Sequence, residues 1–115
     1  MDIPKISKAL FKMPNVKAAI LFGSQAKGKA RRDSDVDVCV ITKNEDDSPL
    51  VLSSEKFDIS LFHRLPNQLR YRVFKDGRVL FSKDDSLLTK LKFWTIKIYL
   101  DEKHWRDIVS ARVLS

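Results

Sequence analysis

Two short apolar runs bracket a long polar segment near the start of the chain, and this arrangement constrains the fold more than any other feature. Ala18–Phe22 and Val36–Ile41 have the length and composition of buried strands, and Gly23 ends the first of them. Ser24–Ala30, rich in Ala and Lys, is expected to form one or two helical turns before the polar loop Arg31–Ser34. A strand, a turn, a short helix and a second strand predict an α/β (α+β) fold.

The remaining sequence predicts further strands and helices around this unit. These are a helix with apolar residues at Ile3, Ile6 and Leu10, a strand at Phe57–Phe62, a helix at Leu65–Lys75, an edge strand at Val79–Phe81, and a long helix from Asp84 or Asp85. Thr42–Lys56 is a polar connection whose form the sequence leaves open. With 115 residues we expect one domain, residues 1–115, in which helices pack on a mixed sheet of about four strands.

The long C-terminal helix carries an apolar stripe. Its members are Leu87, Leu91, Trp94, Ile98, Trp105 and Val109. We expect Asp85 or Ser86 to cap the helix and a break to occur near Leu100–Glu102. Because the tryptophans join the stripe, we interpret them as packing residues and not as a stacking platform.

The composition predicts a folded chain with an excess of positive charge. Hydrophobic residues make up 43% of the sequence, and 22 Lys and Arg against 15 Asp and Glu give a formal net charge of +7. Basic proteins attract phosphate-rich partners, including nucleotides. A core of this size is modest, so we expect a homo- or hetero-oligomeric contact to cover part of the apolar area.

Cysteine content and apolar run lengths bear on the compartment. Cys39 is the only cysteine, so no disulfide can form within the chain, and we interpret it as a small core residue. Met1–Phe11 lacks the continuous apolar segment of a signal peptide, and no apolar run approaches the length of a membrane span. We therefore expect a cytoplasmic protein without a membrane partner.

The turn after the first strand has the features of an anion site. Gly23 tolerates the close approach of another backbone, and Ser24 comes next, at the start of the predicted helix. Free backbone N–H groups and the helix dipole favour an anion there, and the Ser24 hydroxyl adds a donor. A Gly-Ser pair alone is usually only a turn, so the phosphate site depends on the acidic residues further along the chain.

Three aspartates are predicted to converge near this turn. Asp35 and Asp37 are spaced i, i+2 at the start of a strand, which places both carboxylates on one face. Two like charges so close favour a cation, and hard oxygen ligands suit Mg²⁺ or Mn²⁺. Asp58 is a charge within the apolar run Phe57–Phe62, where we expect it to need a partner. If the two strands are neighbours, the three carboxylates can hold two metal ions.

The stretch from Leu21 to Ile41 resembles the DNA polymerase beta-like nucleotidyltransferase superfamily. It is most similar to the minimal nucleotidyltransferase (MNT) branch, whose signature is Gly-Ser, ten residues and then Asp-x-Asp, matched here by Gly23, Ser24, Asp35 and Asp37. Ala26, Gly28, Arg31 and Ser34 also follow the style of the family. The resemblance continues more loosely to the last helix.

The resemblance implies the transfer of a nucleoside monophosphate, AMP above all, from ATP or another triphosphate onto a hydroxyl group. It implies that Gly23 and Ser24 hold phosphates and that Arg31 and Ser34 contribute to nucleotide binding. Two Mg²⁺ ions would be bound, with Mn²⁺ as an alternative, by Asp35, Asp37 and Asp58. Asp58 would also help to activate the acceptor hydroxyl.

The resemblance also implies a partner. Lone MNT domains resemble the antitoxins of HEPN–MNT toxin–antitoxin pairs, in which the MNT protein neutralises a helical HEPN ribonuclease, in some members by adding AMP to a tyrosine. The alternative is a non-catalytic nucleotide-binding protein that neutralises its partner by docking, which Gln25 favours because the family often has Arg there. A nucleic-acid partner ranks last, because no helix shows a basic recognition face.

Overall fold

The computed structural model describes residues 3–23 and 36–114 of the chain. Its helices and strands are α1 (Ile3–Phe11), β1 (Val16–Phe22), β2 (Val36–Thr42), β3 (Phe57–Leu61), α2 (Asn67–Asp76), β4 (Arg78–Ser82) and α3 (Asp85–Leu114). Short 3₁₀ helices at Lys43–Glu45, Ser48–Leu52 and Phe62–Arg64 complete the described chain, and the first two form the connection that the sequence left open.

The strands form one mixed sheet in the order β3-β2-β1-β4. β1 pairs antiparallel with both β2 and β4, whereas β2 pairs parallel with β3. The predicted four-stranded mixed sheet is therefore confirmed, as is the edge position of the fourth strand. The two central strands are β1 and β2, the strands that the apolar runs on either side of the polar segment predicted.

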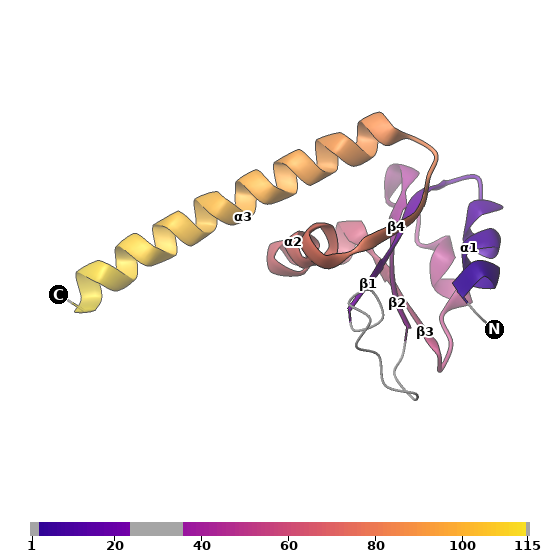
Figure 1. The fold of residues 1–115 in the computed structure, drawn as a ribbon, viewed down its shortest axis with the longest axis horizontal. Helices are drawn as coiled ribbons and strands as arrows, with labels where there is room; N and C mark the ends of the chain where they lie inside the picture. Colours follow the sequence, from indigo (N-terminus) through magenta and orange to yellow (C-terminus); the bar gives the residue numbers. More distant parts are fainter. Residues whose placement is uncertain (1–2, 24–35, 115) are drawn as a thin grey trace.

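Helices cover both faces of the sheet (Figure 1): α1 lies on one side, and α2 and the start of α3 lie on the other. The cluster on the α1 side includes Ile6, Leu10, Leu21, Val38, Val40 and Phe57. The cluster on the α2 side includes Ala18, Ile20, Cys39, Ile41, Phe62 and Val73. Burial on both faces explains why the central strands have continuous apolar sequences.

β2 follows the two-residue alternation that its sequence predicts. Val38 and Val40 belong to the α1-side cluster, and Cys39 and Ile41 belong to the α2-side cluster. Asp37 therefore takes the α2 side of the sheet, because alternate residues of a strand share a face.

α3 differs from its prediction at two points. Its N-cap is Asp84, whose Oδ1 accepts a hydrogen bond of 3.0 Å from the backbone N–H of Leu87, so the predicted cap at Asp85 or Ser86 is wrong. The helix runs for 30 residues, so the predicted break is wrong too. Side-chain contacts stabilise the helix at that place, because Lys97 lies 3.4 Å from Asp101 and Asn67 of α2 donates a 2.9 Å hydrogen bond to Glu102.

The second half of α3 extends beyond the sheet (Figure 1), and its aromatic residues behave differently from one another. The Tyr99 ring stacks on Tyr71 of α2 at a centroid distance of 3.8 Å. Trp94 and Trp105 are instead 54% and 65% exposed, so a packing role for them within this chain is wrong. Periodicity identified the stripe but could not say whether this chain covers it.

None of the helices in the described part of the chain combines the length and the apolar character that a membrane-spanning helix needs.

Candidate functional site

The structure describes three of the seven site residues that the sequence predicted. Gly23, Asp37 and Asp58 lie within the described ranges. The other four lie outside the described residues: they are Ser24, Arg31, Ser34 and Asp35. The predicted helical turns at Ser24–Ala30 and the position of Gln25 lie outside them as well.

Gly23 comes after the last residue of β1 and lies directly against the Asp37 carboxylate. Its backbone has a φ of +77°, a conformation that residues with a Cβ rarely adopt. A Cβ at this position would overlap Oδ2 of Asp37 and lie 3.3 Å from its Cγ. The backbone angle therefore favours glycine, and the missing side chain lets the end of β1 approach the carboxylate closely.

Asp37 and Asp58 are cross-strand neighbours. In the parallel pairing of β2 with β3 they are direct register partners, as are Val38 and Ile59 after them. Register partners on adjacent strands point to the same face, and adjacent strands lie about 4.8 Å apart. In the antiparallel pairing of β1 with β2, Asp37 is opposite Phe22, the residue before Gly23. Three of the predicted site residues thus meet at one end of the sheet, on the side that α2 covers.

The two carboxylates differ in exposure. Asp37 is half-buried, whereas Asp58 is exposed because its neighbours Phe57 and Ile59 turn inward on the opposite face. The expectation that Asp58 is a buried charge in need of a partner is therefore wrong: β3 is an edge strand, and its alternation carries Asp58 outward. The register beside Asp37, and not burial, connects Asp58 to this site.

The described residues fit a divalent metal ion. Two carboxylates side by side provide hard oxygen ligands and a local negative charge, which are the features that Mg²⁺ requires. The neighbouring glycine lets the backbone at the end of β1 approach the Asp37 carboxylate closely, and Mg²⁺ usually completes its coordination with phosphate oxygens. Among residues 3–23 and 36–114, no group of three or more His, Cys, Asp or Glu side chains has metal-site geometry, and the third predicted ligand, Asp35, is outside these ranges.

On the same face as the two carboxylates, β2 and β3 continue with another pair of register partners. Cys39 and Ser60 are register partners, two positions beyond Asp37 and Asp58. Cys39 is fully buried, which confirms its predicted place in the core, and burial raises the pKa of its thiol to about 12. A neutral, buried thiol is neither a nucleophile nor a metal ligand.

Gly77 positions α2 beside the candidate site, although its sequence context predicted only the end of a helix. A Cβ on Gly77 would overlap the Val73 carbonyl oxygen, and it would lie 2.6 Å from Cγ2 of Ile20 and 3.2 Å from the Leu21 carbonyl oxygen. The missing side chain therefore lets the end of α2 contact β1 just before Gly23. The Asp-Gly turn dipeptide was a signal for a turn but not for this close approach.

The chain belongs to the polymerase beta nucleotidyltransferase family. The family model "Polymerase beta, Nucleotidyltransferase" matches residues 4–86, a range that runs from α1 to the start of α3 and includes Gly23, Asp37 and Asp58. The class defined by the fold and the family match is thus that of a nucleotidyltransferase.

The chain is also similar to individual proteins and solved structures. The Methanocaldococcus jannaschii protein named "putative protein adenylyltransferase MJ1547" is 29% identical over 98 residues, which cover 84% of this chain and 75% of that protein. A crystal structure of a toxin–antitoxin complex with AMP-PNP contains a chain of similar fold, with a TM-score of 0.74 and 20% identity over 98% of this chain and 96% of that one.

A second toxin–antitoxin structure also contains a chain of similar fold. It is the complex of the tri-AMPylated Shewanella oneidensis HEPN toxin with its MNT antitoxin, matched with a TM-score of 0.68 and 16% identity over 97% of this chain and 98% of the other. At this identity the likeness concerns the fold, and it includes α3 because nearly all of both chains is covered.

Proposed function

We propose that this chain is a single minimal nucleotidyltransferase domain that transfers AMP from ATP, with Mg²⁺, to a hydroxyl group of a HEPN-type toxin and so acts as its antitoxin. The observation that carries the proposal is the register pairing of Asp37 with Asp58 next to Gly23. The choice of AMP is supported by the adenylyltransferase relative and by the neighbour with AMP-PNP. The choice of acceptor is supported by the neighbour that contains an AMPylated HEPN toxin.

In this proposal the turn after β1 binds the triphosphate. Gly23 brings its backbone close to the phosphates, Ser24 adds a hydroxyl donor, and Arg31 and Ser34 contribute further contacts. The positive φ of Gly23 and its closeness to the Asp37 carboxylate support this role.

The carboxylates would hold the metal ions and receive the acceptor. Asp35, Asp37 and Asp58 would bind two Mg²⁺, for which Mn²⁺ could substitute. Bound metal would neutralise charge on the α-phosphate and on the departing pyrophosphate. The acceptor oxygen forms a bond to the α-phosphorus while the bond between the α- and β-phosphates breaks. The exposure of Asp58 supports a role in taking the hydroxyl proton of an acceptor that arrives from solvent.

The proposed transfer can be tested by labelling either the α-phosphate or the γ-phosphate of ATP. The purified protein is mixed with its cognate HEPN partner, MgCl₂ and ATP labelled at the α-phosphate. We expect the label to stay on the partner under denaturing conditions, and ATP labelled at the γ-phosphate should leave none, because that phosphate departs with pyrophosphate. A folded protein that binds its partner but transfers no α-label would contradict the proposal.

A second comparison separates transfer from docking. Asp37→Asn keeps the shape of the side chain and removes its charge, so we expect it to bind the partner but fail to neutralise the toxin in a growth assay. Full neutralisation by the Asp37→Asn protein would instead show that docking is sufficient. Measuring partner binding in the same experiment ensures that a folding defect is not mistaken for lost transfer.

A further inference from the structure

The outer edge of β3 is held by side chains. β3 is an edge strand, so the N–H groups that point away from β2 have no neighbouring strand to pair with. Two consecutive serines supply acceptors instead. Ser54 Oγ accepts a 3.2 Å hydrogen bond from the Phe57 N–H, and Ser53 Oγ accepts a 3.3 Å hydrogen bond from the Ile59 N–H. The two backbone groups that the serines hold are those on either side of Asp58.

These contacts lie directly beside the candidate site. On the edge of β3 that faces β2, Asp58 is the register partner of Asp37. On the outer edge, Ser54 also donates a 2.8 Å hydrogen bond from its backbone N–H to the carbonyl oxygen of Phe57. The backbone around Asp58 is therefore fixed from both edges, by β2 on one and by the serines on the other.

The two serines are themselves anchored to the body of the chain. They follow the 3₁₀ helix Ser48–Leu52, in which Pro49 is buried and Leu52 packs against the α1-side core cluster. The Ser53 N–H donates a 3.0 Å hydrogen bond to the Leu50 carbonyl oxygen at the end of this helix. The serine hydroxyls thus extend from an anchored backbone, and they can hold β3 in place.

We propose that Ser53 and Ser54 are positioning residues for Asp58: by fixing the backbone on either side of it, they set the place of its carboxylate beside Asp37. The inference rests on the proposed function, because it concerns the same pair of carboxylates. The Asp58 side chain is exposed, so its place depends on its backbone more than on packing. Metal-binding groups need to be held within about 0.5 Å of the productive geometry.

The serine contacts also protect a free sheet edge, which is a general need of edge strands. If protection were their whole role, loss of the hydroxyls would change solubility or stability and leave the metal affinity of the carboxylates unchanged. The positioning role predicts a weaker metal affinity in a folded protein. Water can replace the lost acceptors, but it cannot fix the strand to the anchored connection.

Mn²⁺ affinity tests the positioning role on the purified full chain, with free Mn²⁺ measured by electron paramagnetic resonance. The double variant Ser53→Ala, Ser54→Ala should raise the Mn²⁺ dissociation constant about three- to tenfold, the range expected for two modest hydrogen bonds. Ser53→Thr with Ser54→Thr keeps both hydroxyls and should restore the affinity. Unchanged affinity in the double alanine variant overturns the proposal.

Ser48→Ala is the matched control for this measurement. Its hydroxyl belongs to the same connection but donates a 2.6 Å hydrogen bond to Oδ2 of Asp46. We expect the Mn²⁺ affinity of the Ser48→Ala protein to equal that of the unaltered chain. A loss equal to that of the double alanine variant would overturn the proposal, because it would assign the effect to the connection as a whole.

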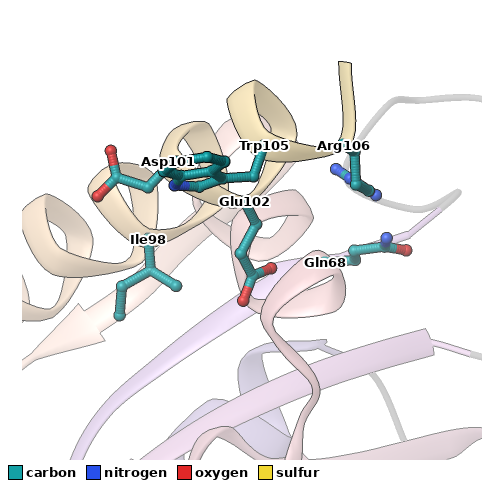
Figure 2. Close-up of a pocket in the computed structure, with 6 residues that line it drawn as sticks. All are labelled: Gln68, Ile98, Asp101, Glu102, Trp105 and Arg106. Atoms are coloured by element: carbon teal, nitrogen blue, oxygen red, sulfur yellow. The ribbon is translucent and has the colours of Figure 1, made fainter. Parts of the chain in front are cut away.

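A second control lies in a different part of the molecule. Figure 2 shows a pocket of about 510 Å³ between α2 and α3, and none of its lining residues belongs to β3 or to the connection before it: Gln68, Ile98, Asp101, Glu102, Trp105 and Arg106. Gln68→Ala truncates an exposed side chain of this pocket. It should leave the Mn²⁺ affinity unchanged, and a loss equal to that of the serine variant overturns the proposal.

A double-mutant cycle shows whether the serines act through Asp58. Asp58→Asn removes the carboxylate charge, so adding Ser53→Ala and Ser54→Ala to it should weaken Mn²⁺ binding no further. A further loss of the same size as in the unaltered chain would show that the serines act on other groups, and it would overturn the proposal. Circular dichroism checks that each variant is folded.

The rate of AMP transfer to the cognate partner separates this inference from the proposed function. At saturating Mg²⁺ the double alanine variant should lower kcat about three- to tenfold and leave the KM for ATP unchanged. An unaltered chain that binds Mn²⁺ but transfers no AMP contradicts the proposed function, and the Mn²⁺ affinities then decide the role of Ser53 and Ser54. An unaltered chain that binds no Mn²⁺ overturns both.

Discussion

The centre of the sheet and the second half of α3 are built by different interactions. Leu21 in β1 and Val38 in β2 are fully buried, with helices on both sides of the sheet. Trp105 and Val109 are 65% and 56% exposed, so this part of α3 depends on its own backbone hydrogen bonds more than on packing. The candidate site therefore lies at the end of a sheet whose centre is closely packed, where small displacements are costly. The projecting helix can contact another chain without disturbing the site.

The greatest loss of stability should come from removing packing at the centre of the sheet. Leu21→Ala should lower the free energy of unfolding by about 2–5 kcal/mol, because it removes methyl groups and leaves a cavity. Trp105→Ala, a larger truncation, should change it by less than about 0.5 kcal/mol in the monomer, because its side chain is mostly in water. Urea unfolding at low protein concentration measures both values. Equal losses would contradict the contrast between the sheet and the helix.

A smaller loss is expected where α2 contacts β1. Gly77→Ala places a Cβ against the Val73 carbonyl oxygen and the Ile20 side chain, so we expect a destabilisation of about 1–3 kcal/mol. The matched control is Arg78→Ala, whose side chain is exposed. An unfolding midpoint for Gly77→Ala equal to that of the control would show that α2 can move away from β1 at no cost.

The helix cap should contribute still less. Asp84→Ala removes the acceptor for the Leu87 N–H and should cost about 1 kcal/mol. Asp85→Ala removes a neighbouring carboxylate that does not cap the helix, and we expect a much smaller change. Amide exchange should rise in the first turn of α3 for Asp84→Ala only. A larger loss of stability for Asp85→Ala than for Asp84→Ala would show that Asp85 is the cap.

Ionisation of the Cys39 thiol should have the least influence on stability at neutral pH. Burial raises the pKa of its thiol from 9.0 to about 12, so the folded protein should not react with a thiol reagent near pH 8, whereas urea-unfolded protein should. In the unfolded chain the thiol loses its proton near its ordinary pKa, while the folded chain retains it. The resulting stabilisation is complete below pH 9.0 and is lost as the pH rises towards about 12. The Cys39→Ala protein should lack this pH-dependent component when the free energy of unfolding is measured at a series of pH values.

The sequence predicted the sheet well because its signals are local. Apolar runs ending at Gly23 and beginning at Val36 identify two strands buried on both faces, and two-residue alternation places Asp37 on the face opposite Val38. The partner strand of β2 was a hypothesis, because periodicity does not determine which strands pair. The parallel register, with Asp58 beside Asp37, became visible only in the structure.

The second half of α3 was harder to predict. The sequence predicted a break near Leu100–Glu102, but α3 continues through this segment, where Asp101 contacts Lys97 of the same helix and Glu102 contacts Asn67 of α2. The stripe was recognised from its spacing, yet spacing cannot show how far a helix extends past the sheet. Exposure of Trp105 depends on that extension and on nothing in its neighbouring sequence.

The rate of AMP transfer to the partner, measured for variants of the two paired carboxylates, decides whether the site is assigned correctly. We expect Asp37→Asn and Asp58→Asn each to lower the rate by about 100-fold or more, a loss typical of removing one group that stabilises transition-state charge. Glu55→Gln is the matched control, because Glu55 is an exposed acid just before β3 and should leave the rate unchanged. Normal transfer by both aspartate variants, or an equal loss in the control, would contradict the assignment of the site to the pair beside Gly23.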